Sequence, residues 1–324
     1  MLTSNHIALF LPSFFLFIYT DAANAARARW MGLVTSTAFQ FNPAIQPRAF
    51  VALGCLAREE VDDDLLYQIL VALRGALAMF VESDCNLIAS IVMCLTNIAA
   101  NLPAESRYLQ HMFWLGLSIV EIGHVPLFTC ALELLQAVLK VLDAQGFFVH
   151  ASLDEVLLKA REPLLDVAKE LDESVGLNLE THFSFGVAGA LLKGLKHPST
   201  KTITTDVLKL ILQIAVKGAQ PDMVDVRVMG YFAALLPQAA RNMVLKELLH
   251  MVGIRSIDVN DAALNDTYYK MFDYLVIPDN TTGLLLVTLV VTMLQNAETE
   301  SERLFLYAFL AEAAVALPEV FALV

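Results

Sequence analysis

Charged residues are scarce in this sequence, and those present are mostly acidic. Asp, Glu, Lys and Arg make up 17% of the 324 residues, compared with about 25% in typical soluble proteins. The 34 acidic residues outnumber the 21 basic ones, which leaves a net charge of −13. Such a charge repels phosphate backbones and anionic membranes, so we expect no nucleic-acid partner. Basic surfaces or grooves of other proteins are compatible partners, although acidity is also the ordinary way to keep an apolar protein soluble.

Motifs that mark known chemistry are missing. The chain contains no GxGxxG or GxxxxGK(S/T) loop for phosphates, no HExxH zinc motif and no GxSxG nucleophile turn. Its cysteines form no CxxC pair, and its histidines are nowhere spaced four residues apart. These residues are Cys55, Cys85, Cys94, Cys130, His6, His111, His124, His150, His182, His197 and His250. We therefore predict no catalytic, cofactor-binding or metal-binding residue, no cofactor, and reduced, buried thiols.

One acidic run, Asp62, Asp63 and Asp64, needs an interpretation of its own. The Asp-Asp-x-x-Asp pattern of metal-binding helical enzymes is not met, because Leu65 and Leu66 follow. Acids at a helix N-terminus complement the helix dipole, so we predict that a helix starts here. Two aromatic pairs are interpreted as core: Phe113 with Trp114, and Tyr231 with Phe232.

Apolar residues are abundant and recur with helical spacing. The chain is 57% hydrophobic, against about 45–50% in typical proteins. In residues 62–80, Leu66, Ile69 and Leu73 follow the i, i+3, i+7 spacing of one helix face, while Gln68 and Arg74 fall outside it. No run of alternating polarity competes with these patterns, so the predicted fold class is all-α.

Capping and proline signals divide the chain into helices. Ser152 with Glu155, and Thr299 with Glu302, have the spacing of capping boxes. We expect residues 42–43 (Asn-Pro) to end one helix and Pro47 to start the next. Pro163 and Pro221 are also placed at helix starts, and Gly194 and Gly218 at helix ends after a lysine. The predicted helices are 24–39, 47–58, 64–80, 85–100, 106–121, 126–143, 153–161, 163–172, 181–193, 200–217, 223–235, 239–251, 261–275, 281–296 and 300–315.

Consecutive helix pairs recur about every 40 residues, which is the period of HEAT and armadillo repeats. We therefore predict an irregular HEAT/armadillo-like helical solenoid, continuous over residues 23–324. Repeats of this kind cover the apolar faces of their neighbours. The uncapped apolar ending, residues 317–324, is what we expect of a segment cut from a longer array.

The first 22 residues differ from the rest. Residues 7–19 are a dense apolar run, and the alanine-rich residues 22–28 have spacings like those of a signal-peptidase site. However, no Lys or Arg precedes the run, which is shorter than the about 20 residues that a membrane helix needs. Two interpretations stay open: a signal-like segment, or a core helix or sequence foreign to the native gene. The other long apolar run, residues 283–294, has the length of a buried helix, so no membrane span is predicted.

Four stretches resemble a known protein family. They are residues 29–57, 113–114, 175–199 and 231–241. In order and spacing they resemble neurofibromin and the fungal Ira-type Ras GTPase-activating proteins, in the helical region C-terminal to the GTPase-activating and Sec14-PH modules. The resemblance covers residue 29 to the C-terminus and leaves out residues 1–22.

The resemblance implies a HEAT-like scaffold segment of a large negative regulator of Ras. It implies a cytoplasmic protein that is peripheral at membranes, has protein partners, and self-associates through its helical arrays. It also implies contact with the Ras pathway only through the rest of a larger protein. No enzyme activity is implied for the segment, because FNPAI at residues 41–45 lacks the preceding Leu-Arg of the GTPase-activating module. The alternatives are a stand-alone HEAT-like adaptor without Ras function, and an all-helical enzyme with a pocket between helices.

Overall fold

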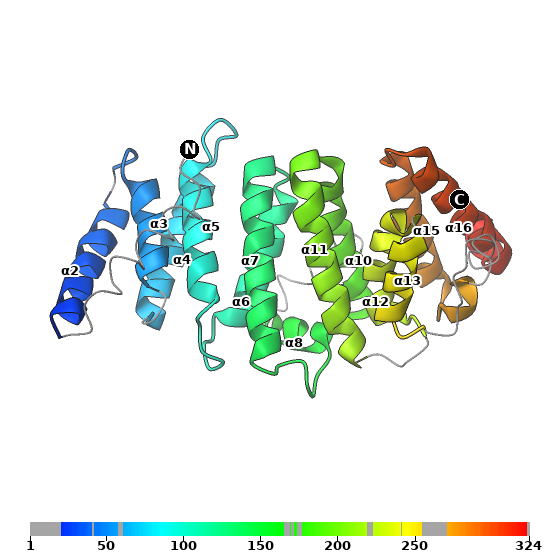
Figure 1. Cartoon of the computed structure of the whole chain (residues 1–324), viewed down its shortest axis with the longest axis horizontal. Helices are drawn as coiled ribbons and strands as arrows, with labels where there is room; N and C mark the ends of the chain where they lie inside the picture. Colours follow the sequence, from blue (N-terminus) through cyan, green and yellow to red (C-terminus); the bar gives the residue numbers. More distant parts are fainter. Residues whose placement is uncertain are drawn as a thin grey trace. The chain divides into compact units, whose positions relative to one another are not determined.

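The computed structural model of the chain is all-α (Figure 1). It describes residues 21–40, 42–57, 61–164, 169, 172–173, 177–218, 223–240, 242–254 and 271–322. Within these ranges the β-type pairings are two isolated bridges, Val81 with Asp84 and Val224 with Leu275. The prediction of an all-α helical solenoid is thereby confirmed. The interpretations of residues 1–20 lie outside the described residues.

The chain divides into two compact units, residues 1–145 (unit 1) and residues 146–324 (unit 2). The expectation of one continuous array over residues 23–324 stays a prediction. In both units, several helices pack more closely on the helix two places along the chain than on the next one, as α3 (Gln46–Leu56) does on α5 (Asn86–Ala99) and α10 (Leu179–Leu192) on α12 (Val226–Leu235).

Unit 1 is a set of packed helices in which α3, α5 and α7 (Val125–Ala144) lie against one another in turn. Its helices are α2 (Asp21–Ala38), α3 (Gln46–Leu56), α4 (Asp63–Ala78), α5 (Asn86–Ala99), α6 (Leu109–Glu121) and α7 (Val125–Ala144). Helix α3 packs on α2 and α5, while α7 packs on α5 and α6. A Cβ on Gly54 of α3 would lie 2.7 Å from the Cα of Cys94 on α5. Only glycine therefore permits this close crossing.

The corner between α2 and α3 is held by hydrogen bonds of Asn42 and Gln46 as well as by prolines. Helix α2 ends at Ala38, earlier than the expected break at Asn42. The Asn42 carbonyl accepts hydrogen bonds from the backbone N–H groups of Ile45 and Gln46. The Gln46 side chain reaches back and donates to the Ala38 carbonyl at 2.9 Å, which satisfies one carbonyl at the end of α2. Pro47 lies in the first turn of α3, as predicted.

Helix α7 is the last helix of unit 1. By length and composition it is long and apolar enough to cross a membrane. Half of its most apolar window is buried inside the unit, against α5 and α6. The apolar residues of α7 are therefore part of the core of unit 1, together with those of α3 to α6.

Unit 2 is arranged around α12. Its α-helices are α8 (Leu153–Lys159), α10 (Leu179–Leu192), α11 (Pro198–Ala215), α12 (Val226–Leu235), α13 (Asn242–Met251), α15 (Asn280–Gln295), α16 (Glu300–Ala316) and α17 (Pro318–Phe321). Short 3-10 helices are η1 (Glu162–Leu164), η2 (Lys193–Lys196), η3 (Val216–Gly218), η4 (Leu236–Ala240) and η5 (Met271–Tyr274). Helix α12 packs on α10, α11 and α15, and every residue from Val228 to Leu236 is buried.

Local cap signals predict the helix ends well. Both capping boxes are present, with Glu155 accepting from the Ser152 N–H at 2.9 Å and Glu302 from the Thr299 N–H at 3.2 Å. The prediction that a helix ends at Gly194 is wrong, because this residue lies inside η2. The Gly194 carbonyl accepts a hydrogen bond from the Thr200 hydroxyl. The short α17 was not predicted. Pro163 lies in η1, whereas Pro221 and most of predicted helix 261–275 lie outside the described residues.

Candidate interaction surface

Reactive side chains are not gathered into a site in the described part of the chain. Within those residues no three His, Cys, Asp or Glu side chains lie together as a metal site requires. Two histidines contact their own neighbours: His111 Nδ1 lies 2.7 Å from the Arg107 carbonyl, and His197 Nδ1 lies 2.7 Å from the Ser199 hydroxyl. His124 packs edge-on against the Phe80 ring. His150 and His250 are exposed, and His182 contacts Thr181.

Of the four cysteines, Cys94 is buried as predicted, whereas Cys55, Cys85 and Cys130 are only partly buried. None of the four forms a disulfide. Burial raises the pKa of the Cys94 thiol far above its usual range. Burial, with smaller contributions from Glu133 and Cys85, raises the pKa of Cys130 to about 12. Because the thiolate is the reactive form, burial lowers the reactivity of these two thiols at neutral pH.

The acidic run at residues 62–64 starts a helix, as predicted. The Asp62 carboxylate accepts a hydrogen bond from the Leu65 N–H at 2.7 Å and caps α4. Asp63 lies in the first turn and forms an ion pair with Arg107 at 3.1 Å. The carboxylates therefore stabilise the helix start and point to no metal site.

A polar contact fixes the crossing of α10 and α12 inside unit 2. The Ser184 hydroxyl donates to the Val226 carbonyl at 2.6 Å and accepts from the Gly230 N–H at 3.2 Å. Next to Gly230 on α12, Tyr231 is fully buried, as predicted for a core residue. Burial, with a smaller contribution from Asp154, raises its pKa well above the usual value. These groups hold two helices together and are closed to a substrate.

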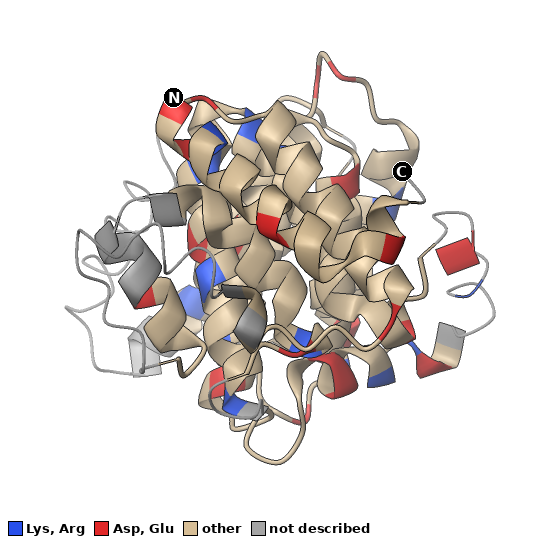
Figure 2. Ribbon diagram, turned by 90° about the vertical axis from the view of Figure 1, so that its right-hand side faces the viewer, with Lys and Arg blue, Asp and Glu red and all other residues tan. Residues whose placement is uncertain are grey.

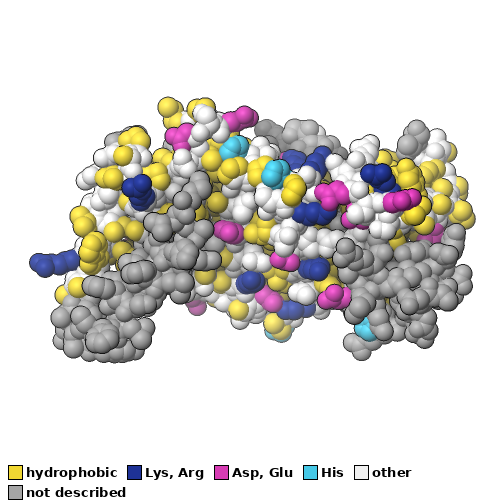
Figure 3. All heavy atoms as spheres, turned by 45° about the horizontal axis from the view of Figure 1, so that its top comes forward, with side chains coloured by type: hydrophobic (Ala, Val, Ile, Leu, Met, Phe, Trp, Pro, Cys, Tyr) yellow, Lys and Arg dark blue, Asp and Glu magenta, His cyan; other side chains and the backbone are white. Residues whose placement is uncertain are grey.

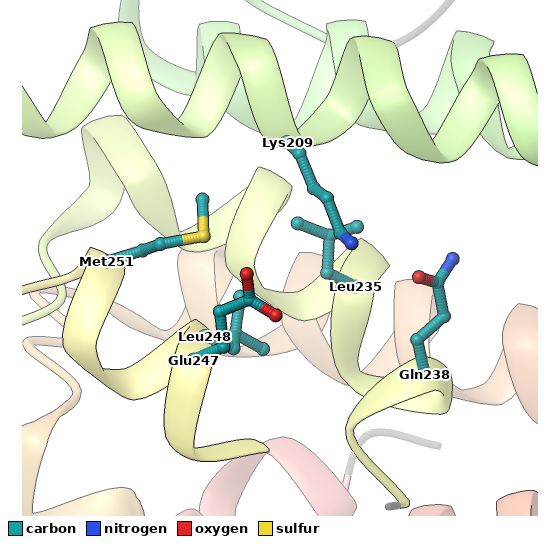
Figure 4. A pocket seen from close by; sticks show the side chains of 6 residues that line it. All are labelled: Lys209, Leu235, Gln238, Glu247, Leu248 and Met251. Atoms are coloured by element: carbon teal, nitrogen blue, oxygen red, sulfur yellow. The ribbon is translucent and has the colours of Figure 1, made fainter. Parts of the chain in front are cut away.

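A small hollow in unit 2 lies between α11, α12, η4 and α13 (Figure 4). We call it the α11 groove, and it is lined by Lys209, Leu235, Gln238, Glu247, Leu248 and Met251. Lys209 points from α11 toward Leu235, while Glu247 and Met251 face the same space from α13. Gln238 also lines a second hollow, which contains Lys201 from the start of α11. The hollow has room for about one water molecule. Its cation and carboxylate form no nucleophile–base pair.

Large apolar side chains are exposed on several helices. In unit 1, Tyr67 and Val71 point outward from α4, on the side opposite to its buried residues. In unit 2, Leu304, Tyr307 and Val315 are exposed on α16. Figure 3 shows hydrophobic side chains on the surface at the right-hand end, where α16 lies in Figure 1. Such side chains take part in a protein–protein contact where they form a contiguous apolar patch.

Sequence reasoning did not find the α11 groove or these outward faces. Residues such as Leu304 and Tyr307 have the same apolar character as core positions. A signal was nevertheless present, because α16 is apolar on more than one side, whereas an ordinary surface helix is apolar on one. The groove gives no comparable signal, since Lys209, Gln238 and Glu247 come from three separate elements.

Comparison with known proteins finds a distant relative. No family model matches the chain. Inhibitory regulator protein IRA2 of Saccharomyces cerevisiae is 22% identical over 199 residues, which is 60% of this chain and 6% of the yeast protein. The chain is similar to an Ira-type regulator. It corresponds to a small fraction of that relative's length, so the activity and partners of the whole yeast protein are not carried over by the similarity itself.

Proposed function

We propose that the chain is a non-catalytic helical scaffold segment of a neurofibromin/Ira-like negative regulator of Ras signalling. In this proposal it acts through protein–protein contacts, including self-association, in a cytoplasmic protein that is peripheral at membranes. The similarity to IRA2 carries the proposal, since it agrees with the family indicated by residues 29–57 and 231–241. The helical arrays, with outward apolar side chains on α4 and α16, support a contact role.

The Ras link is tested in the source organism. Deleting the gene that encodes this chain should raise the GTP-bound fraction of Ras, and reintroducing the intact gene should restore it. An unchanged fraction after deletion would refute the Ras link and favour the stand-alone adaptor.

The non-catalytic and self-association parts are tested with the purified chain. Added to GTP-loaded Ras, it should leave the rate of GTP hydrolysis at the intrinsic value, and an accelerated rate would refute the non-catalytic assignment. Sedimentation velocity over a range of concentrations should show an oligomer. A monomer at all concentrations would remove self-association from the proposal.

A further inference from the structure

We draw no further inference here: the strongest candidate, the outward apolar side of α16 with Leu304, Tyr307 and Val315 at the end of unit 2 that faces the viewer in Figure 2, carries nothing, because nothing in the described part of the structure shows what covers it.

Discussion

Replacing Gly230 by Ala tests how closely the helices of unit 2 must approach. A Cβ at this position of α12 would lie 2.4 Å from the carbonyl carbon and oxygen of Ser184 and 2.6 Å from the backbone nitrogen of Phe185. These are backbone atoms of α10, so no side-chain rotation can relieve the overlap. The two helices would have to separate, which also weakens the 3.2 Å hydrogen bond from the Gly230 N–H to the Ser184 hydroxyl.

The size of the effect follows from three contributions. Overpacking a well-packed core costs about 1–3 kcal/mol, and losing a hydrogen bond costs about 0.5–1.5 kcal/mol. Against these, Ala is favoured over Gly inside a helix by about 1 kcal/mol. We expect Gly230→Ala to lower the free energy of unfolding by about 0.5–3.5 kcal/mol.

The matched control is Gly189→Ala on α10, in the same unit. No atom of another side chain or neighbouring element lies within 4 Å of the added Cβ there. The only contribution there is the higher helix propensity of Ala over Gly, so the free energy of unfolding should rise by up to about 1 kcal/mol. Urea unfolding followed by far-UV circular dichroism measures both variants. A Gly230→Ala chain as stable as the Gly189→Ala chain would refute the close crossing of α10 and α12.

Three further predictions concern caps, charge and thiols. Thr299→Ala removes the capping box of α16 and should cost about 0.5–2 kcal/mol in urea unfolding; an unchanged midpoint would contradict the cap. The Asp279 carboxylate accepts from the Thr282 N–H at 2.7 Å, which holds its pKa below the ordinary 3.8. Because this pKa is depressed, the stabilisation is complete above 3.8 and is lost as the pH falls through the folded value. The original chain should therefore lose more stability on acidification than Asp279→Asn, and equal acid titrations of stability would count against it. Cys94 is fully buried and should react with a thiol reagent at about pH 8 only as fast as the chain unfolds; rapid labelling of Cys94 in the folded chain would contradict this burial.

Local signals explain why most of the fold could be predicted. Capping boxes such as Ser152 with Glu155 act over three residues, so the sequence alone is enough to place them. The same holds for the acidic start of α4 and for Pro47 in the first turn of α3. One error also has a local cause. Helix α2 ends at Ala38 because the Gln46 side-chain amide donates to the Ala38 carbonyl, which would accept from a backbone N–H if the helix continued.

Contacts between distant residues explain what could not be predicted. Gly230 and Ser184 are 46 residues apart, and neither shows in sequence that it touches the other. The α11 groove likewise joins Lys209, Gln238 and Glu247 from three elements. Periodicity shows that Leu304 and Phe309 are apolar, but which of them faces the core depends on where α15 and α17 pack.

The most direct test of the central claim connects the fold of unit 2 to Ras. Cells of the source organism would carry either Gly230→Leu, which no arrangement of the Ser184 backbone can accommodate, or Gly189→Ala, which meets open space. The GTP-bound fraction of Ras is then measured in each. The scaffold proposal predicts a raised fraction with Gly230→Leu and the ordinary fraction with Gly189→Ala. An ordinary fraction in both, with unit 2 unfolded in the Gly230→Leu protein, would contradict it.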